Sequence, residues 1–337
     1  MGIVFSCLER LGLFGQSSSR TMTRLILSTG NIISGGPSII RKPGAYRSNL
    51  EFTNSLRSSF LAAQQDYGAA STNGSAKDAA TNGKPSSQIN GDRPATDIWT
   101  QRDGDALYVP RIDWSGAGLQ EERAQYEITL KLFFLPTAPA ADRPKYITAA
   151  MDLVKKELGV ADVDLLIVSF PGMSFQGDCE WEADKMNGSM GNDEEELYTW
   201  TALEALHQQG QIQRLGIAEF GSEKLSNFIT KVKVRPAVDQ INIKNCCNVP
   251  PPLAQLAKEA DIELLTHSDC TDILPSGTLR ELLGQGPDGA GILADERTRP
   301  GLQGNLVPQW VVKYTAFVKD RGVIENKGYF AGAELEE

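Results

Sequence analysis

Residues 203–220 read LEALHQQGQIQRLGIAEF and hold the end of a helix, a turn and a strand. The leucines of the first half stand at helical spacing, and Gly210 is a residue type that commonly follows the last turn of a helix. Residues 214–220 follow as a predicted strand, and the continuous apolar run VDLLIVSF at 163–170 is typical of a strand that is buried on both faces. The stretch therefore predicts a helix over 194–209 that leads directly into a strand of a parallel sheet.

The same alternation of strand and helix signals extends on both sides of this stretch. The further predicted strands are 126–135, 163–170, 238–243, 262–266 and 323–330, and the further predicted helices are 146–158, 225–232 and 310–319. Repeated strand–helix units indicate a parallel α/β sheet, either doubly wound or closed as a barrel. A doubly wound dinucleotide fold should carry G-x-G-x-x-G after its first strand, and this sequence does not. The predicted fold is therefore a (β/α)8 TIM barrel.

Composition narrows the class of function. The net charge of −10 argues against nucleic acid as the main partner, because phosphate binding favours a basic face. No run approaches the ~18 apolar residues of a membrane helix. Five cysteines, two of them adjacent, do not form a disulfide framework, so we expect a reducing, cytoplasmic setting. The two histidines cannot build a three-histidine zinc site.

Two segments differ in composition from the main body, which we place at 24–330. Residues 1–23 form a predicted disordered tail, in which Gly2, Ser6 and Cys7 fit an acylation pattern. An unstructured tail, or translation that starts at Met22, is the favoured alternative to acylation. Residues 68–97 are small and polar, and we expect a disordered insertion there. Residues 331–337 are expected to be a C-terminal tail.

Several strings resemble the aldo-keto reductase family. The opening stretch is similar to L-E-x-L-x-x-x-G-K-I-R-x-I-G-V-S-N-F, RPAVDQI (235–241) to K-P-A-V-N-Q-V, and DLLIVSFP (164–171) to D-L-Y-L-I-H-W-P. Within that superfamily, five strings resemble the glutamate–cysteine ligase regulatory (modifier) subunits. They are STGNII (28–33), KLFF (131–134), QINIKNCCNVPP (240–251), LLTHSD (264–269) and WVVKYTAFVKDRGVIENKGYF (310–330).

The reductase resemblance implies a site with a tyrosine as general acid, a lysine and an aspartate that tune its pKa, and a histidine that orients the carbonyl. Lys131 matches the lysine, whereas Phe170 stands at the position of the histidine. Ala218 and Glu219 replace the Ser-Asn pair that holds the nicotinamide, and Gln240 keeps its match. The D-T-A-x-x-Y string is absent from the first part of the chain. Lys131, Phe170 and Gln240 are therefore expected to be vestigial, with no catalytic, cofactor or metal site.

The sequence also holds only seven residues after Phe330, where the segments that close over a reductase cofactor would follow. We expect a barrel truncated after its last strand. His267 is expected to be a hydrogen-bonded structural residue, and the acidic run 193–196 a charge cluster at a helix N-terminus rather than a metal site. Cys246 and Cys247 are candidates for a partner contact or redox chemistry, and inert buried thiols are the alternative.

The regulatory-subunit resemblance implies a cytoplasmic pseudoenzyme without a cofactor. Such a protein forms a heterodimer with the glutamate–cysteine ligase catalytic subunit, an ATP-dependent enzyme, and raises its activity in glutathione biosynthesis. The alternative is an active NADPH-dependent aldo-keto reductase. A barrel scaffold with a different partner is a third hypothesis.

Overall fold

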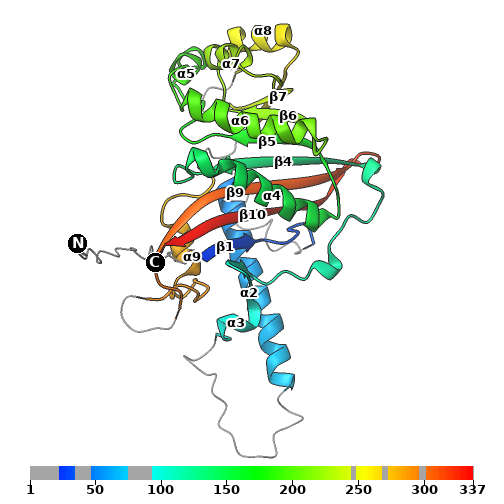
Figure 1. Ribbon diagram of the computed structural model, residues 1–337, viewed down its shortest axis with the longest axis vertical. Helices are drawn as coiled ribbons and strands as arrows, with labels where there is room; N and C mark the ends of the chain where they lie inside the picture. Colours follow the sequence, from blue (N-terminus) through cyan, green and yellow to red (C-terminus); the bar gives the residue numbers. More distant parts are fainter. Residues whose placement is uncertain are drawn as a thin grey trace, which may run out of the picture.

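The computed structural model describes residues 23–34, 47–74, 93–243, 248–267, 272–295 and 301–336, in which ten strands form one sheet. The strand order is β2-β3-β1-β10-β9-β4-β5-β6-β7-β8 (Figure 1). The bounds are β1 Thr23–Ser28, β2 Gln101–Asp103, β3 Ala106–Val109, β4 Tyr126–Phe134, β5 Val163–Ser169, β6 Ile212–Ala218, β7 Val238–Asn242, β8 Glu263–His267, β9 Asn305–Val318 and β10 Val323–Glu336.

Strands β4 to β8 form the parallel half of the sheet. The helices are α2 Ser48–Gly74, α3 Thr96–Trp99, α4 Arg143–Leu158, α5 Glu180–Asn187, α6 Asp193–Gln208, α7 Ser222–Ile229, α8 Pro251–Ala260 and α9 Thr278–Leu283. Helices α4, α6, α7 and α8 connect the parallel strands in turn, which confirms the predicted α/β class with a parallel sheet. Hydrogen bonds do not close the sheet into a full barrel, because β2 and β8 are its edges over the described residues.

The stretch that predicted the fold forms the expected helix, turn and strand. Helix α6 begins after Asn192, whose side chain accepts hydrogen bonds from the backbone N–H groups of Glu194 and Glu195. It ends at Gln208, and Gly210 then takes a positive φ of 73°, which costs glycine little. β6 follows within two residues, so the helix packs back onto its own strand.

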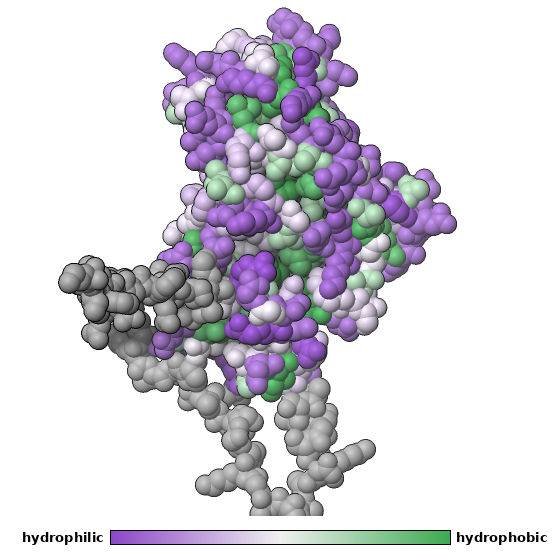
Figure 2. Space-filling view, in the orientation of Figure 1, coloured by the Kyte–Doolittle hydropathy of each residue, from purple (hydrophilic) through white to green (hydrophobic). Residues whose placement is uncertain are grey.

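The sheet has a hydrophobic core on each face. On one face, α4, α6 and α7 cover β4 to β7 and the centre of the β9–β10 hairpin. On the other face, α2 crosses β1, β9 and β10 and packs with α9. The ring of Phe52 on α2 lies 5.2 Å from that of Tyr329 on β10. In Figure 1, α4 lies in front of the hairpin and α2 behind it; Figure 2 shows that the front face is mostly hydrophilic, with apolar side chains between the helices.

The helix predicted over 310–319 is wrong. Those residues belong to β9, which pairs antiparallel with both β4 and β10. The segment WVVKYTAFV alternates: Val312, Tyr314 and Ala316 join the α4 core, whereas Val311 joins the α2 core. Period-two burial and β-branched side chains therefore outweigh the helical interpretation. β10 also extends through Glu336, so the tail expected from residue 331 is largely strand.

The structure also differs from the predicted bounds of the disordered segments. α2 extends to Gly74 and α3 begins at Thr96, so both ends of the expected 68–97 insertion are helical. Alanine and glutamine propagate a helix readily once its first turns are anchored by packing. Residues 75–92 and 1–22 lie outside the described residues, and Thr23 begins β1. No helix in the described part of the chain is both long and apolar enough to span a membrane.

Candidate functional site

Lys131 on β4 and Gln240 on β7 meet on the face of the sheet opposite Leu130 and Leu132. The Lys131 ammonium donates to Gln240 Oε1 over 2.5 Å, and it also lies 5.3 Å from the centre of the Phe133 ring. In a flat sheet, strands three positions apart are separated by about 14 Å. Because the two side chains nevertheless touch, the parallel half must curve around this face as the wall of a barrel does.

Apolar side chains occupy two positions where a reductase needs polar groups. Phe170, directly after β5, is 3% exposed and its ring lies 6.0 Å from that of Phe220. A phenyl ring can neither donate a hydrogen bond to a carbonyl nor titrate. Ala218, the last residue of β6, is fully buried and joins a small apolar cluster with Leu165 and Ile167. These positions therefore contribute packing rather than recognition.

Glu219 is the most heavily bonded residue of the site. Its carboxylate oxygen Oε1 lies 2.8 Å from His267 Nε2, and Oε2 accepts a hydrogen bond from the backbone N–H of Asn242 over 3.2 Å. Its backbone N–H donates to the carbonyl of Gln240. The residue is 3% exposed and has a φ of 66°, a conformation that costs a non-glycine residue free energy. Several buried contacts hold Glu219 in this conformation.

Helix α5 supports the loop that contains Glu219. The buried Asn187 side chain donates to the carbonyl of Glu219 over 2.7 Å and accepts from the N–H of Gly221 over 2.6 Å. Asp184 accepts from both the N–H and the hydroxyl of Ser222 at the start of α7. The sequence analysis did not single out Asn187 or Asp184, because their function depends on a loop that is distant in sequence.

Asp239 is a second buried carboxyl group beside this network. It is fully buried on β7, and burial raises the pKa of its carboxyl group well above the ordinary value. The nearby Glu219 carboxylate raises this pKa further, whereas Lys131 and a backbone hydrogen bond at Phe220 lower it. The reductase pattern K-P-A-V-N-Q-V has asparagine where this chain has Asp239, and this difference was the sequence signal that could have identified the residue. Asp239 is thus expected to be held in its neutral form.

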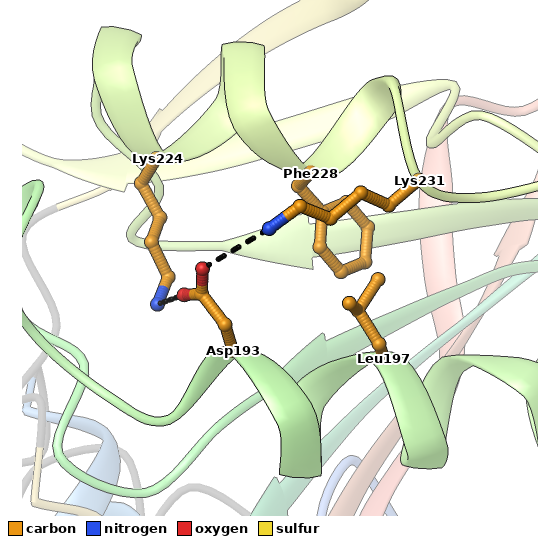
Figure 3. Close-up of a pocket in the computed structure, with 5 residues that line it drawn as sticks. All are labelled: Asp193, Leu197, Lys224, Phe228 and Lys231. Atoms are coloured by element: carbon orange, nitrogen blue, oxygen red, sulfur yellow. Dashed lines mark hydrogen bonds and ion pairs between the residues drawn. The ribbon is translucent and has the colours of Figure 1, made fainter.

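The acidic run 193–196 lies at the start of α6, where it was predicted, and part of it encloses Lys224. The Lys224 ammonium lies 2.7 Å from Asp193 Oδ1, 2.9 Å from Glu196 Oε2 and 2.7 Å from the carbonyl of Met190. Figure 3 shows Asp193 between Lys224 and Lys231. The adjacent cavity measures only about 10 Å³, and the described residues include no cluster suited to a metal ion. The cluster joins α6 to α7 and has no room for a ligand.

Four of the five cysteines, including Cys246 and Cys247, lie outside the described residues. Cys179, the residue before α5, is an exposed free thiol. The segments with Cys246, Cys247 and Cys270 follow β7 and β8, which pair in parallel as far as Asn242 and His267.

The chain is similar to several known proteins. Residues 108–301, more than half of the chain, match the aldo/keto reductase family. The glutamate–cysteine ligase regulatory subunits of Homo sapiens and Rattus norvegicus are 29% and 31% identical over 216 residues, which cover 64% of this chain and 68% of each relative. A Bombyx mori aldo-keto reductase, solved with NADP, has a TM-score of 0.31 at 22% identity, over 42% of this chain and 40% of that chain.

Proposed function

Since the chain belongs to the aldo/keto reductase family and, within it, to the glutamate–cysteine ligase regulatory subunits, we propose that it is a non-catalytic subunit. In this proposal it binds the catalytic subunit of glutamate–cysteine ligase in the cytoplasm and raises its activity. The observation that carries the proposal is the commitment of Glu219 to His267 and Asn242 within the former reductase site.

The residues of this site do not fit a nicotinamide cofactor. A carboxamide needs a donor and an acceptor, and Ala218 supplies neither through its side chain. The Glu219 carboxylate is acceptor-only and already engaged, so a cofactor would have to separate it from buried partners. Gln240 retains its reductase identity, but its amide oxygen accepts from Lys131. The polar groups at these positions therefore stabilise the protein's own fold.

A protein without a catalytic site can still regulate an enzyme by binding. If it binds one conformation of the catalytic subunit more tightly than another, it shifts the population toward the favoured conformation. A substrate-competent conformation that is favoured in this way shows tighter substrate binding. The size of the effect is limited by the difference between the two binding free energies.

Affinity purification of the full chain from cells, with identification of partners by mass spectrometry, tests the proposed partner. We expect the glutamate–cysteine ligase catalytic subunit to be recovered, and its glutamate affinity to rise when the purified chain is added. A chain that binds the catalytic subunit but leaves its kinetics unchanged would contradict the regulatory function.

The reductase alternative has a separate test. A fluorescence titration with NADPH should show no saturable binding up to the micromolar range. The double variant Ala218→Ser/Glu219→Asn restores the reductase residues at these two positions. We expect it to lose stability, because His267 and the Asn242 N–H lose their carboxylate partner. We expect no gain of NADPH affinity, because Phe170 still stands at the histidine position. Micromolar binding by the natural chain would support the reductase instead.

A further inference from the structure

A groove of about 330 Å³ lies between the N-terminal half of α4 and the strands β1, β10 and β9 behind it (Figure 1). Its floor contains three residues in register on adjacent strands, because Ile26 of β1 pairs with Gly332 of β10, and Gly332 pairs with Trp310 of β9. Ile26 and Trp310 are 7% and 2% exposed and belong to the core under α4, so this floor is apolar. We call it the α4 groove. Its volume is that of a site for a small organic molecule.

An irregularity in β9 turns the side chain of Gln309 into the α4 groove. Trp310 and Pro308 pair with consecutive residues of β10, so Gln309 between them is the extra residue of a β-bulge. Regular alternation after Trp310 would point Gln309 to the opposite face of the sheet. Instead its Nε2 donates to the Glu334 carboxylate over 3.2 Å, and the residue lines the groove. Bulges that redirect a side chain in this way are common beside functional sites.

The amide oxygen of Gln309 is a buried acceptor that has no hydrogen-bond partner among the described residues. The residue is only 3% exposed. Turning the amide around would not satisfy this oxygen, because it would then face the Glu334 carboxylate, which is also an acceptor. An unpaired acceptor of this kind destabilises the fold and calls for an explanation. Its position in a groove indicates a ligand that carries an N–H or O–H donor.

The Glu334 carboxylate adds a negative charge to the same end of the groove. It accepts hydrogen bonds from the hydroxyl of Tyr146 and from Gln309 Nε2, which are both neutral donors. Burial and the nearby Glu334 raise the pKa of Tyr146, so its hydroxyl keeps its proton. The basic side chains that line the groove, Arg24 and Lys145, pair with other carboxylates at the rim, where they are 50% and 78% exposed. Glu334 therefore has no ion-pair partner among the described residues.

We propose that the α4 groove binds a small primary amine in its protonated form. An ammonium group carries a positive charge and three N–H donors, which match the Glu334 carboxylate and the unpartnered Gln309 oxygen. The Trp310 indole in the floor can stabilise a cation further, and the apolar floor suits an alkyl or aromatic body. A metal ion fits poorly, because the described residues include no cluster of metal ligands. This inference does not depend on the proposed function.

Calorimetric titration of the purified full chain with three probes tests the proposal near pH 7, where an alkylamine is protonated, in a buffer without amines. Hexylamine should bind with a Kd of about 1 mM. Hexyltrimethylammonium keeps the charge and the chain but has no N–H donor, so it should bind at least about fivefold more weakly. Hexanoate has the opposite charge and should not bind. Equal affinity for the two cations, or binding of hexanoate, would overturn the proposal.

Two pairs of variants locate the binding site. Glu334→Gln removes the charge and should weaken hexylamine binding roughly tenfold, whereas Glu336→Gln, an exposed position on the same strand, should leave it unchanged. Ala149→Leu narrows the groove from α4 and should also weaken binding, whereas the exposed Thr148→Leu should not. The second pair retains every polar group, so it remains informative if Glu334→Gln unfolds. Unchanged affinity in a folded groove variant would contradict the assignment.

A fourth probe distinguishes a free amine from a lysine side chain of another protein. Nα-acetyl-lysine N-methylamide carries the same ammonium group on a four-carbon stem with peptide groups at its other end. We expect it to bind more weakly than hexylamine, because its peptide groups would meet the apolar floor of the groove. Tighter binding of the lysine derivative would overturn the free amine as the occupant.

Discussion

Glu219 Oε1 and His267 Nε2 lie 2.8 Å apart. Glu219 directly follows β6 and His267 ends β8, and these two strands do not pair with each other. The strand between them, β7, supplies the Asn242 N–H to the same carboxylate. One side chain therefore connects three consecutive strands at their carboxyl ends. This is the edge at which parallel α/β sheets usually bind ligands, and here it is held together by internal contacts.

A double-mutant cycle measures the Glu219–His267 contact. Glu219→Gln and His267→Gln should each destabilise the protein by roughly 2–4 kcal/mol, because each leaves a buried polar partner incompletely paired. The double variant should cost less than the sum of the two single variants. Urea unfolding provides the free energies, and exposed Glu223→Gln, four residues from Glu219, is a control expected to stay within about 0.5 kcal/mol. Strict additivity would contradict the coupling.

Asp239→Asn should raise stability, and the gain should depend on pH. The folded-state pKa of this carboxyl group is raised above its unfolded value, so its contribution to stability is fully present below about pH 4 and is lost as pH rises. The Tm difference between Asp239→Asn and the natural chain should therefore grow from pH 4 toward pH 7. For the exposed control Asp320→Asn, the Tm difference from the natural chain should not change with pH. The same result for Asp239→Asn would contradict a neutral Asp239 carboxyl group in the folded protein.

Lys224 and Lys231 both contact Asp193 but should differ greatly in their contribution to stability. Lys224→Met leaves the buried Glu196 carboxylate without its cation, which should cost about 3–5 kcal/mol. Lys231→Met removes an exposed contact of 3.5 Å and should cost less than about 1 kcal/mol. Adding Glu196→Gln to Lys224→Met should recover part of the loss. Equal midpoints of urea unfolding for the two lysine variants would be inconsistent with this assignment.

Subunit association should respond to glutamate if the proposed regulation is an equilibrium effect. An allosteric coupling of about 1–3 kcal/mol would tighten glutamate binding to the catalytic subunit roughly 5–150-fold. By linkage, saturating glutamate must tighten subunit association by the same factor. The measurement is the subunit Kd with and without glutamate at fixed ionic strength. An unchanged Kd alongside a real shift in glutamate affinity would rule out this mechanism.

The adjacent cysteines give a conditional prediction about the partner contact. If Cys246 or Cys247 forms an intersubunit disulfide, a non-reducing gel of the oxidised complex should show a heavier band. Cys246→Ser/Cys247→Ser should abolish that band, whereas Cys179→Ser should retain it. A band that survives the double substitution would shift attention to Cys179 or Cys270.

The repeating middle of the chain was the most predictable part. Residues 126–267 alternate apolar runs with helical spacing, and glycines such as Gly159 and Gly210 mark helix ends. Five strands and the helices α4, α6 and α7 were therefore predicted, whereas α5 and α8 were not. The 310–319 segment was less predictable, because its strand character depends on pairing with β4, which is about 180 residues away in sequence. The position of Glu219 could be read from the family pattern. Its pairing with His267 could not, because it depends on how β6, β7 and β8 align.

The pairing of β1 with β10 affects the order in which the protein can fold during synthesis. Thr29 Oγ1 accepts a hydrogen bond from the N–H of Tyr329, a residue 300 positions later, and Thr23 pairs with Leu335. During translation β1 can pair with β3 early, but its other edge has to wait until β10 leaves the ribosome. An unpaired strand edge invites association with other chains. The newly made chain is therefore exposed to aggregation for nearly the whole of its synthesis, and a chaperone that shields β1 would act chiefly in that interval.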